Sequence, residues 1–319
     1  FVEIMDNLVA SLIHAGRGSA ALKLVRLLKK MEGSERFSPE KRAAIAATVG
    51  STLRPDTVLA LLPALDGEKP LAPEEAMEFF DYFGPRHCAS LVDLLARLQS
   101  MKIRKATLGA LVKLGRENPA SFLPFLQDQR WFLVRNIIFI LGQLGYAEGL
   151  DHVARLAAHP EQRVRKEVLG YLQRRSEPRA RAVMMRFLQD ENVNLRVRAL
   201  QALGAARYLP ALKNIEAMAE AKDFAERTPG ERIAVYEALG LLAGESMLPR
   251  LREMLKKRFL FGRARDKESV ACAVAALRRI RTPGAVRVLE EAEAERRGTE
   301  VSMLIADALK EVAAEMPQA

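Results

Sequence analysis

Apolar residues along this chain recur at the spacing of one face of an α-helix. Leu133–Leu141 carries apolar residues at positions i, i+4, i+5 and i+8, and Leu195–Leu203 repeats that spacing. These positions lie on the same side of a helix. A turn follows each segment, beginning at Gly142 and Gly204, and glycine is a common helix stop. The pattern predicts helix pairs, with second helices at Leu150–Ala158, Ala180–Leu188, Leu209–Met218 and Met247–Leu255.

The helix pair is repeated along the chain. The frame L-R-V-R-A-L-Q-A-L-G at Leu195–Gly204 has counterparts at intervals of 28 to 38 residues. A repeat of this length is typical of stacked helical arrays, in which each unit buries an apolar face against its neighbour. The apolar residue before the frame's glycine marks the copies at Leu12, Val49, Phe83, Leu111, Leu141, Leu172, Leu203, Leu239, Leu277 and Leu309.

The V/L-R-x-A-x-x-A-L-G signature, at Leu195–Gly204 and partly at Val164–Gln173, resembles the HEAT-repeat family, in particular the short HEAT-like repeats of phycobilisome lyases. The resemblance covers residues 100–319 well and residues 1–99 loosely. We therefore expect divergent N-terminal repeats at 1–99, continuous with HEAT-like repeats at 100–319 in one elongated solenoid. The implied fold is all-α, a right-handed α-α superhelix of HEAT/armadillo type with about nine to ten helix pairs. Tetratricopeptide repeats keep a constant period of about 34 residues, which the variable spacing here argues against.

Charged residues at two positions of the repeat are interpreted as structural. The frame's second position is arginine at Arg104, Arg165, Arg196 and Arg232. In HEAT-like families such an arginine often pairs with an acidic residue of the adjoining unit, and Val134, Val270 and Ser302 would interrupt that ladder here. Carboxylates are expected to cap the first helices just ahead of their starts, at Asp128, Asp190 and Asp266.

Composition fits a helical array and gives an expectation about location. Apolar residues make up 49% of the chain and aromatic residues 6%, a mixture that suits helix-on-helix packing. No apolar run approaches the roughly 18 residues that a membrane span needs, so no membrane insertion is expected. Cys88 and Cys272 lie far apart and suggest no disulfide framework, which favours a reducing cytoplasm. The chain starts at Phe1 without a signal pattern, so we expect a fragment of a longer protein.

Positive charge is concentrated in two stretches. The chain holds 50 basic and 40 acidic residues. Residues 161–188 have a net charge of +5 and residues 248–281 a net charge of +8, so the remainder is slightly acidic. These stretches predict an acidic protein partner, with nucleic acid as the alternative.

Two longer connections, Ala221–Glu231 and Lys256–Asp266, mark candidate binding loops, because insertions in arrays emerge on one face. In the second loop, basic residues can neutralise phosphates or carboxylates and aromatics can stack or fill a pocket. The alternative is a helix end followed by a loop anchored by its two phenylalanines. The candidate residues are Lys256, Lys257, Arg258, Phe259, Phe261, Arg263 and Arg265.

Two further candidates lie in the middle of the chain. Arg179, Arg186 and Arg175 have a spacing that lets them share a helix face, although a solvated face with scattered ion pairs is the favoured interpretation. Trp131 is the only tryptophan. If exposed it would anchor a partner, but packing between repeats is favoured.

Catalytic and metal signatures are missing from the sequence. The four histidines form no H-x-x-x-H or H-E-x-x-H pair, and His87-Cys88 has no further ligands near it. The serine-hydrolase, P-loop and dinucleotide motifs are also absent. We therefore predict no enzyme activity, no metal and no cofactor.

The sequence favours a non-enzymatic interaction scaffold or adaptor that binds a protein partner along a curved helical-repeat surface. The main alternative is a HEAT-like protein that binds the phosphate backbone of nucleic acid. Two less favoured hypotheses are a relative of the alkylpurine DNA glycosylases and a chromophore-lyase subunit. Both are based on resemblance alone. Oligomeric state stays open.

Overall fold

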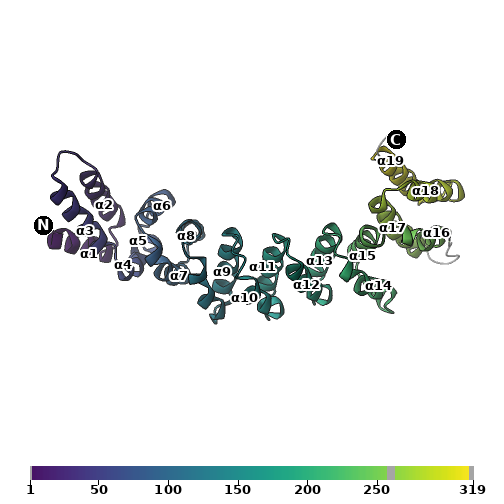
Figure 1. Cartoon of the computed structure of the whole chain (residues 1–319), viewed down its shortest axis with the longest axis horizontal. Coiled ribbons are helices and arrows are strands. Elements are labelled where there is room, and N and C mark those ends of the chain that lie inside the picture. Colours follow the sequence, from purple (N-terminus) through teal and green to yellow (C-terminus); the bar gives the residue numbers. More distant parts are fainter. Residues whose placement is uncertain (1, 257–262, 316–319) are drawn as a thin grey trace. The chain divides into compact units, whose positions relative to one another are not determined.

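The computed structural model describes residues 2–256 and 263–315, and all the regular structure in those ranges is helical (Figure 1). This confirms the all-α prediction. Within the described ranges no helix combines the length and apolar character that crossing a membrane requires. The chain divides into two compact units, residues 1–171 and 172–319.

Unit 1 consists of short helices that pack in sequence order. α1 contacts α2 and α3, and α8 contacts α6, α7 and α9. Helices on both sides of residue 99 therefore belong to this one unit, and the division predicted there stays a prediction. The elements are α1 (Val2–His14), α2 (Gly18–Glu32), α3 (Pro39–Thr52), α4 (Pro55–Ala60), α5 (Leu62–Asp66), α6 (Pro73–Asp81), η1 (Pro85–His87), α7 (Cys88–Arg97), α8 (Met101–Leu114), η2 (Pro119–Gln127), α9 (Trp131–Gln143), α10 (Leu150–Ala154), η3 (Arg155–Ala158) and α11 (Gln162–Gln173), whose last residues belong to unit 2.

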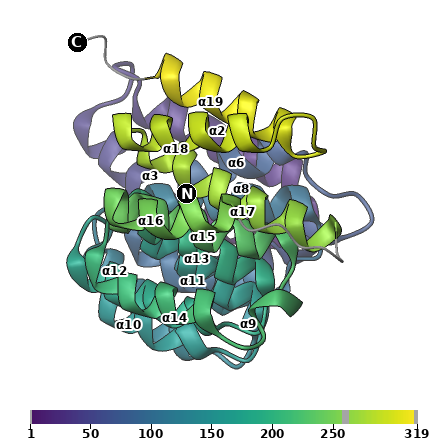
Figure 2. The ribbon, with the colours of Figure 1, turned by 90° about the vertical axis from the view of Figure 1, so that its right-hand side faces the viewer.

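Unit 2 shows the stacking of a helical-repeat solenoid. The first helices contact one another in the order α13, α15, α17 and α19. The second helix α18 contacts α19, and Figure 2 shows the two side by side. The elements are α12 (Pro178–Met184), η4 (Met185–Gln189), α13 (Val193–Ala205), η5 (Leu209–Ala211), α14 (Leu212–Glu220), η6 (Phe224–Glu226), α15 (Pro229–Ala243), η7 (Gly244–Met247), α16 (Leu248–Lys256), α17 (Arg263–Ile280), α18 (Pro283–Glu295) and α19 (Ser302–Ala314).

The predicted first helices form the core. Within the marker set, the six residues from Leu111 to Leu277 are fully buried. At two outer copies the predicted register is wrong by one residue. Leu12 and Leu309 are only partly buried, while Ile13 and Ala308 are fully buried. The frame's glycine is missing from α19, so the sequence offered no landmark for its register there.

The predicted second helices are present but are not continuous α-helices. Leu150–Ala158 folds as α10 followed by the 3₁₀ turn η3, and Ala180–Leu188 as α12 followed by η4. The other two begin with 3₁₀ turns, η5 and η7, before α14 and α16. Short 3₁₀ segments at helix ends are common because they tighten the last turn.

The glycine of the repeat frame has a different role from the one predicted. Gly204 and Gly240 lie inside α13 and α15 rather than after them. A Cβ on Gly240 would come 2.5 Å from the backbone oxygen of Ala276, and one on Gly204 would come 3.2 Å from the Cα of Ala238. The frame glycine therefore permits close contact with the next first helix. Gly145, with φ of +65°, is a true turn residue.

The expected helix caps are also displaced. Asp128 and Asp190 accept hydrogen bonds from N–H groups two residues on, and so close turns before the helix. Asn192 caps α13 instead, accepting from the N–H groups of the second and third helical residues. Asp266 is in the first turn of α17, because that helix begins at Arg263.

Candidate interaction surfaces

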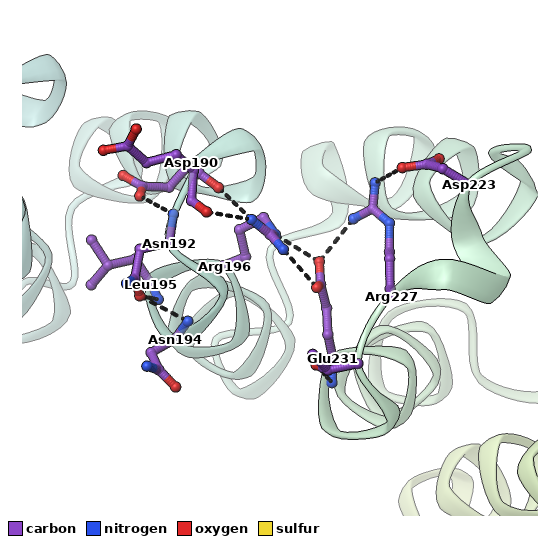
Figure 3. A network of polar contacts seen from close by, with 10 residues as sticks. Asp190, Asn192, Asn194, Leu195, Arg196, Asp223, Arg227 and Glu231 are labelled. Carbon is purple, nitrogen blue, oxygen red and sulfur yellow. Dashed lines mark hydrogen bonds and ion pairs between the residues drawn. The ribbon is translucent and has the colours of Figure 1, made fainter.

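A polar network joins two consecutive first helices of unit 2 (Figure 3). Arg196 on α13 donates from Nε and Nη2 to the two carboxylate oxygens of Glu231 on α15, each over 2.7 Å. Arg227 donates to the same carboxylate over 2.8 Å and is itself 3.4 Å from Asp223. The bidentate pair is the ladder contact predicted for the frame arginine, and it confirms the structural role of Arg196.

The third nitrogen of Arg196 bonds the chain that precedes its own helix. Nη1 donates to the carbonyl oxygens of Asp190 and Glu191, over 2.6 and 3.1 Å. Arg165 does the same one repeat earlier, reaching the carbonyls of His159 and Pro160. Carbonyl groups at the C-terminal end of a helix have no intrahelical donor. A guanidinium group placed there donates hydrogen bonds to them and is stabilised by the negative end of the helix dipole.

Glu231 is an acidic side chain with no exposed surface. Burial acts to raise its pKa, but hydrogen bonding and charge from Arg196, assisted by Arg227, outweigh that effect and hold the pKa below its ordinary value. The backbone N–H of Glu231 also donates to the cap residue Thr228. Sequence reasoning missed Glu231, although its position one residue before the frame arginine of the next repeat was available as a signal.

The other frame arginines vary in partner. Arg232 pairs with Glu268 of the next first helix over 2.8 Å, as the ladder predicts. Arg104 instead lies with its guanidinium carbon 5.7 Å from the centre of the Phe132 ring. Both contacts join adjoining repeats.

An open hollow of about 850 Å³ lies beside the network of Figure 3. The second helix α14 and the longer connection after it form one side, and Arg196, Arg227, Asp190 and Asp223 contribute charged groups. Both arginines already bond carboxylates, and Lys213 is a further cation of the lining. Its volume falls in the range of ligand sites, but it is open to solvent and its lining mixes apolar residues such as Leu188 and Met218 with the charged groups.

The basic stretch at 248–281 is largely compensated by neighbouring repeats. Within its described part, five arginines form ion pairs of 2.7 to 3.2 Å with carboxylates outside the stretch. The pairs are Arg250–Glu220, Arg252–Glu291, Arg278–Glu311, Arg279–Glu237 and Arg281–Glu315. The net charge of +8 along the sequence therefore overstates the free charge on the surface.

The candidate loop that follows α16 lies mostly outside the described residues. Lys256 is exposed at the end of α16. Lys257, Arg258, Phe259 and Phe261 lie outside the described residues, as do the side chains of Arg263 and Arg265. Their predicted role in binding stays a prediction.

The second basic candidate separates into two environments. Arg179 on α12 and Arg186 in η4 are exposed. The side chain of Arg175 is 7% exposed, lies 3.8 Å from Glu177, and precedes α12. It lines a hollow of about 530 Å³ together with Arg174 and Arg181.

Trp131 occupies the first position of α9 and is partly buried. Its ring meets the Phe132 ring edge to face, with centroids 6.0 Å apart and planes at 86°. The guanidinium carbon of Arg163, on the next first helix, lies 5.0 Å from the centre of the tryptophan ring. From the sequence, Arg163 was counted only among the basic residues of 161–188 and Phe132 was not singled out, so neither contact with Trp131 was predicted. The repeat interval could have found them, because Trp131 and Arg163 are 32 residues apart.

No group of three or more histidine, cysteine, aspartate or glutamate side chains suited to a metal ion occurs in the described part of the chain. His87 is buried, with Nε2 2.6 Å from the carbonyl oxygen of Leu53 and Nδ1 2.9 Å from the backbone nitrogen of Gly84. Burial raises the pKa of the Cys88 thiol and raises that of Cys272 to about 11. These groups are held in structural contacts or as unreactive thiols.

Comparison with known proteins supports the repeat assignment for part of the chain. Residues 119–204, from η2 to the end of the Leu195–Gly204 frame, match the family model described as HEAT repeats. This confirms the resemblance over that segment. No curated protein sequence matches the chain.

Two solved structures show low similarity. The complex of CpcE and CpcF of phycocyanin lyase from Nostoc sp. PCC7120 has a TM-score of 0.35 and 16% identity, covering 77% of this chain and 97% of that chain. A computationally designed self-assembling cyclic homo-oligomer has a TM-score of 0.14 and 12% identity, covering 97% of this chain and 94% of that chain. At these scores neither likeness carries an argument about function.

Proposed function

We propose that this chain, whose residues 119–204 are HEAT repeats, is a non-enzymatic scaffold that binds a protein partner across several consecutive repeats. The observation that carries the proposal is the stacking of successive first helices through ion pairs such as Arg196–Glu231 and Arg232–Glu268. Such stacking brings side chains from several repeats onto one continuous surface. Surfaces of this kind bind partners through area and charge match rather than through a deep pocket.

An acidic partner is favoured by the cations that face solvent. Arg179 and Arg186 are exposed in unit 2, and Lys256 is exposed at the end of α16. Complementary charge speeds encounter and selects against basic partners more than it adds affinity. We therefore expect the affinity for the partner to decrease as the salt concentration rises, and part of the binding to persist at high salt.

Affinity capture with the full chain as bait tests this function. Lysate is divided into nuclease-treated and untreated halves, and a parallel bait carries Arg179→Ser and Arg186→Ser. Protein partners retained after nuclease treatment, and reduced on the variant bait, are the expected result. A bait with Arg116→Ser and Arg155→Ser loses the same charge from two other exposed positions and should capture as the parent does. Loss of every partner with nuclease treatment would overturn the proposal.

Binding to nucleic acid is the second candidate, and the same exposed arginines favour it. Neutralising phosphates releases counterions, so affinity for a duplex would fall steeply with salt and be nearly independent of sequence. Titration with random-sequence duplex DNA at two salt concentrations separates this candidate from the first.

A further inference from the structure

Four side chains from three consecutive repeats of unit 1 form a continuous row, in which two arginines lie over two rings that meet edge to face. Arg104 on α8 lies over the ring of Phe132, and Arg163 on α11 lies over the ring of Trp131, with the two rings adjacent on α9. The distances from guanidinium carbon to ring centre are 5.7 and 5.0 Å. We call these four residues the stacked cluster. Cation–π contacts of this kind orient an arginine without using its in-plane N–H groups.

The two guanidinium groups are available for a carboxylate. Within the described residues, Arg104 has no acidic side chain as ion-pair partner. The side chain of Arg163 is 66% exposed, and its only described ion pair, with Glu161, is long at 3.9 Å. A planar guanidinium that is held on a ring and open at its edge is suited to a bidentate contact with a carboxylate.

The surroundings of the stacked cluster add apolar and basic surface. Met101, on the first turn of α8, is 74% exposed. Lys166, three residues after Arg163 on α11 and so on the same helix face, is also exposed. An apolar side chain beside several cations matches a partner segment that carries both carboxylates and an apolar residue.

We propose that the stacked cluster is the docking site for an acidic, extended segment of a partner protein; this inference rests on the scaffold function proposed above. Packed helices are about 8–10 Å apart, so two steps from α8 through α9 to α11 span roughly 16–20 Å. An extended chain advances about 3.3–3.6 Å per residue. The segment should therefore carry acidic residues about five or six positions apart, one for each arginine.

A peptide fits the stacked cluster better than a nucleic-acid strand does. Successive bases stack on open, parallel ring faces. Here Arg163 covers a face of Trp131 and Arg104 covers a face of Phe132, while the two rings stand at 86° to each other.

Selection from a random peptide library on the full chain tests the site. Enriched peptides are expected to contain acidic residues with the spacing given above. The double variant Arg104→Ser/Arg163→Ser should bind them about tenfold or more weakly, since each arginine contributes a charge-assisted hydrogen bond. The charge-matched control Arg116→Ser/Arg155→Ser should bind them as the parent does. Both variants should keep the helicity of the parent, because all four substituted side chains are wholly or partly exposed. The double variant should unfold at a slightly lower temperature, since it loses two exposed cation–π contacts.

Trp131 provides a second readout, because it is the only tryptophan in the chain. Its fluorescence should change when an enriched peptide binds the parent. Peptides that bind without changing the fluorescence, or that bind the double variant equally well, would overturn the site while leaving the scaffold function standing.

The remaining outcomes separate the site from the function. If no peptide is enriched, the docking site is overturned, and partners retained in the nuclease-treated capture would still support the scaffold. If a single-stranded oligothymidylate binds in place of the peptides and loses affinity in the double variant, the cluster is a nucleic-acid surface and the proposal is wrong.

Discussion

Arg196 and Glu231 form a bidentate ion pair between consecutive first helices, with both N–O distances at 2.7 Å. The arginine keeps 20% of its side chain exposed, whereas the glutamate has none. The same guanidinium bonds two carbonyls of the turn before its own helix. One side chain therefore joins a repeat to the turn before it and to the repeat after it.

Replacing Glu231 with glutamine should destabilise unit 2. The amide keeps the shape of the side chain but leaves Arg196 without its anion and Arg227 with only its longer contact to Asp223. Removing one partner of a buried pair costs about 3–5 kcal/mol, and the residual exposure of the arginines lowers our expectation to about 2–3 kcal/mol. Urea unfolding followed by circular dichroism measures the change. Glu237→Gln is the control, because its pair with Arg279 is more exposed and should contribute less than about 1 kcal/mol.

The stability from this pair should decrease in acid. The pKa of Glu231 is lowered in the folded chain, so the unfolded chain binds more protons at intermediate pH. The contribution is complete above the ordinary glutamate pKa of about 4.3 and is lost as the pH falls through the lowered folded value. The gap in urea midpoint between the parent and Glu231→Gln should therefore shrink below about pH 4. A gap that stays constant from neutral pH to pH 3 would contradict this.

Gly240→Ala should weaken the contact between α15 and α17. The new Cβ would come 2.5 Å from the carbonyl oxygen of Ala276, and backbone on both helices would have to move. Overpacking of this kind costs about 1–3 kcal/mol. Gly109→Ala on α8 is the matched control, since nothing lies within 4 Å of its added Cβ. The control should stabilise the chain by up to about 1 kcal/mol through helix propensity. Equal thermal midpoints for the two variants would argue against the close contact.

Cys272 should resist thiol reagents in the folded chain. Burial raises its pKa to about 11, although the charge of Arg232 acts in the opposite direction. At pH 8 the thiolate fraction is then more than about 100-fold below that of an ordinary cysteine, and burial also blocks access. A Cys88→Ser background isolates the reaction with a chromogenic disulfide. Modification should be slow in buffer and fast in urea, and a fast reaction in buffer would show that α17 opens readily.

Periodicity predicted the repeats well where the frame is intact. The buried side chains of α9 and α13 follow the i, i+4, i+5, i+8 pattern, because helix geometry alone decides which residues share a face. The same pattern misplaced the register at Leu12 and Leu309, where the frame is weak. It also assigned the frame glycine to a turn, since the need for close contact depends on the neighbouring helix.

The pairing of charged side chains was the feature that the sequence predicted least well. Arg279 lies in a stretch with a net charge of +8, yet its partner Glu237 is 42 residues away on another helix. Trp131 and Arg163 are likewise brought together only by the stacking of α9 and α11. Neither pairing follows from neighbours along the chain.

The sequence by itself therefore determined the helix pairs, the repeat interval and most of the buried face, because these depend on local geometry and on burial of apolar surface. The tertiary structure alone decided which charges are paired and which side chains form the stacked cluster. Ion pairs and ring contacts depend on distances of a few ångströms between side chains one repeat apart, and those distances exist only after the helices have stacked.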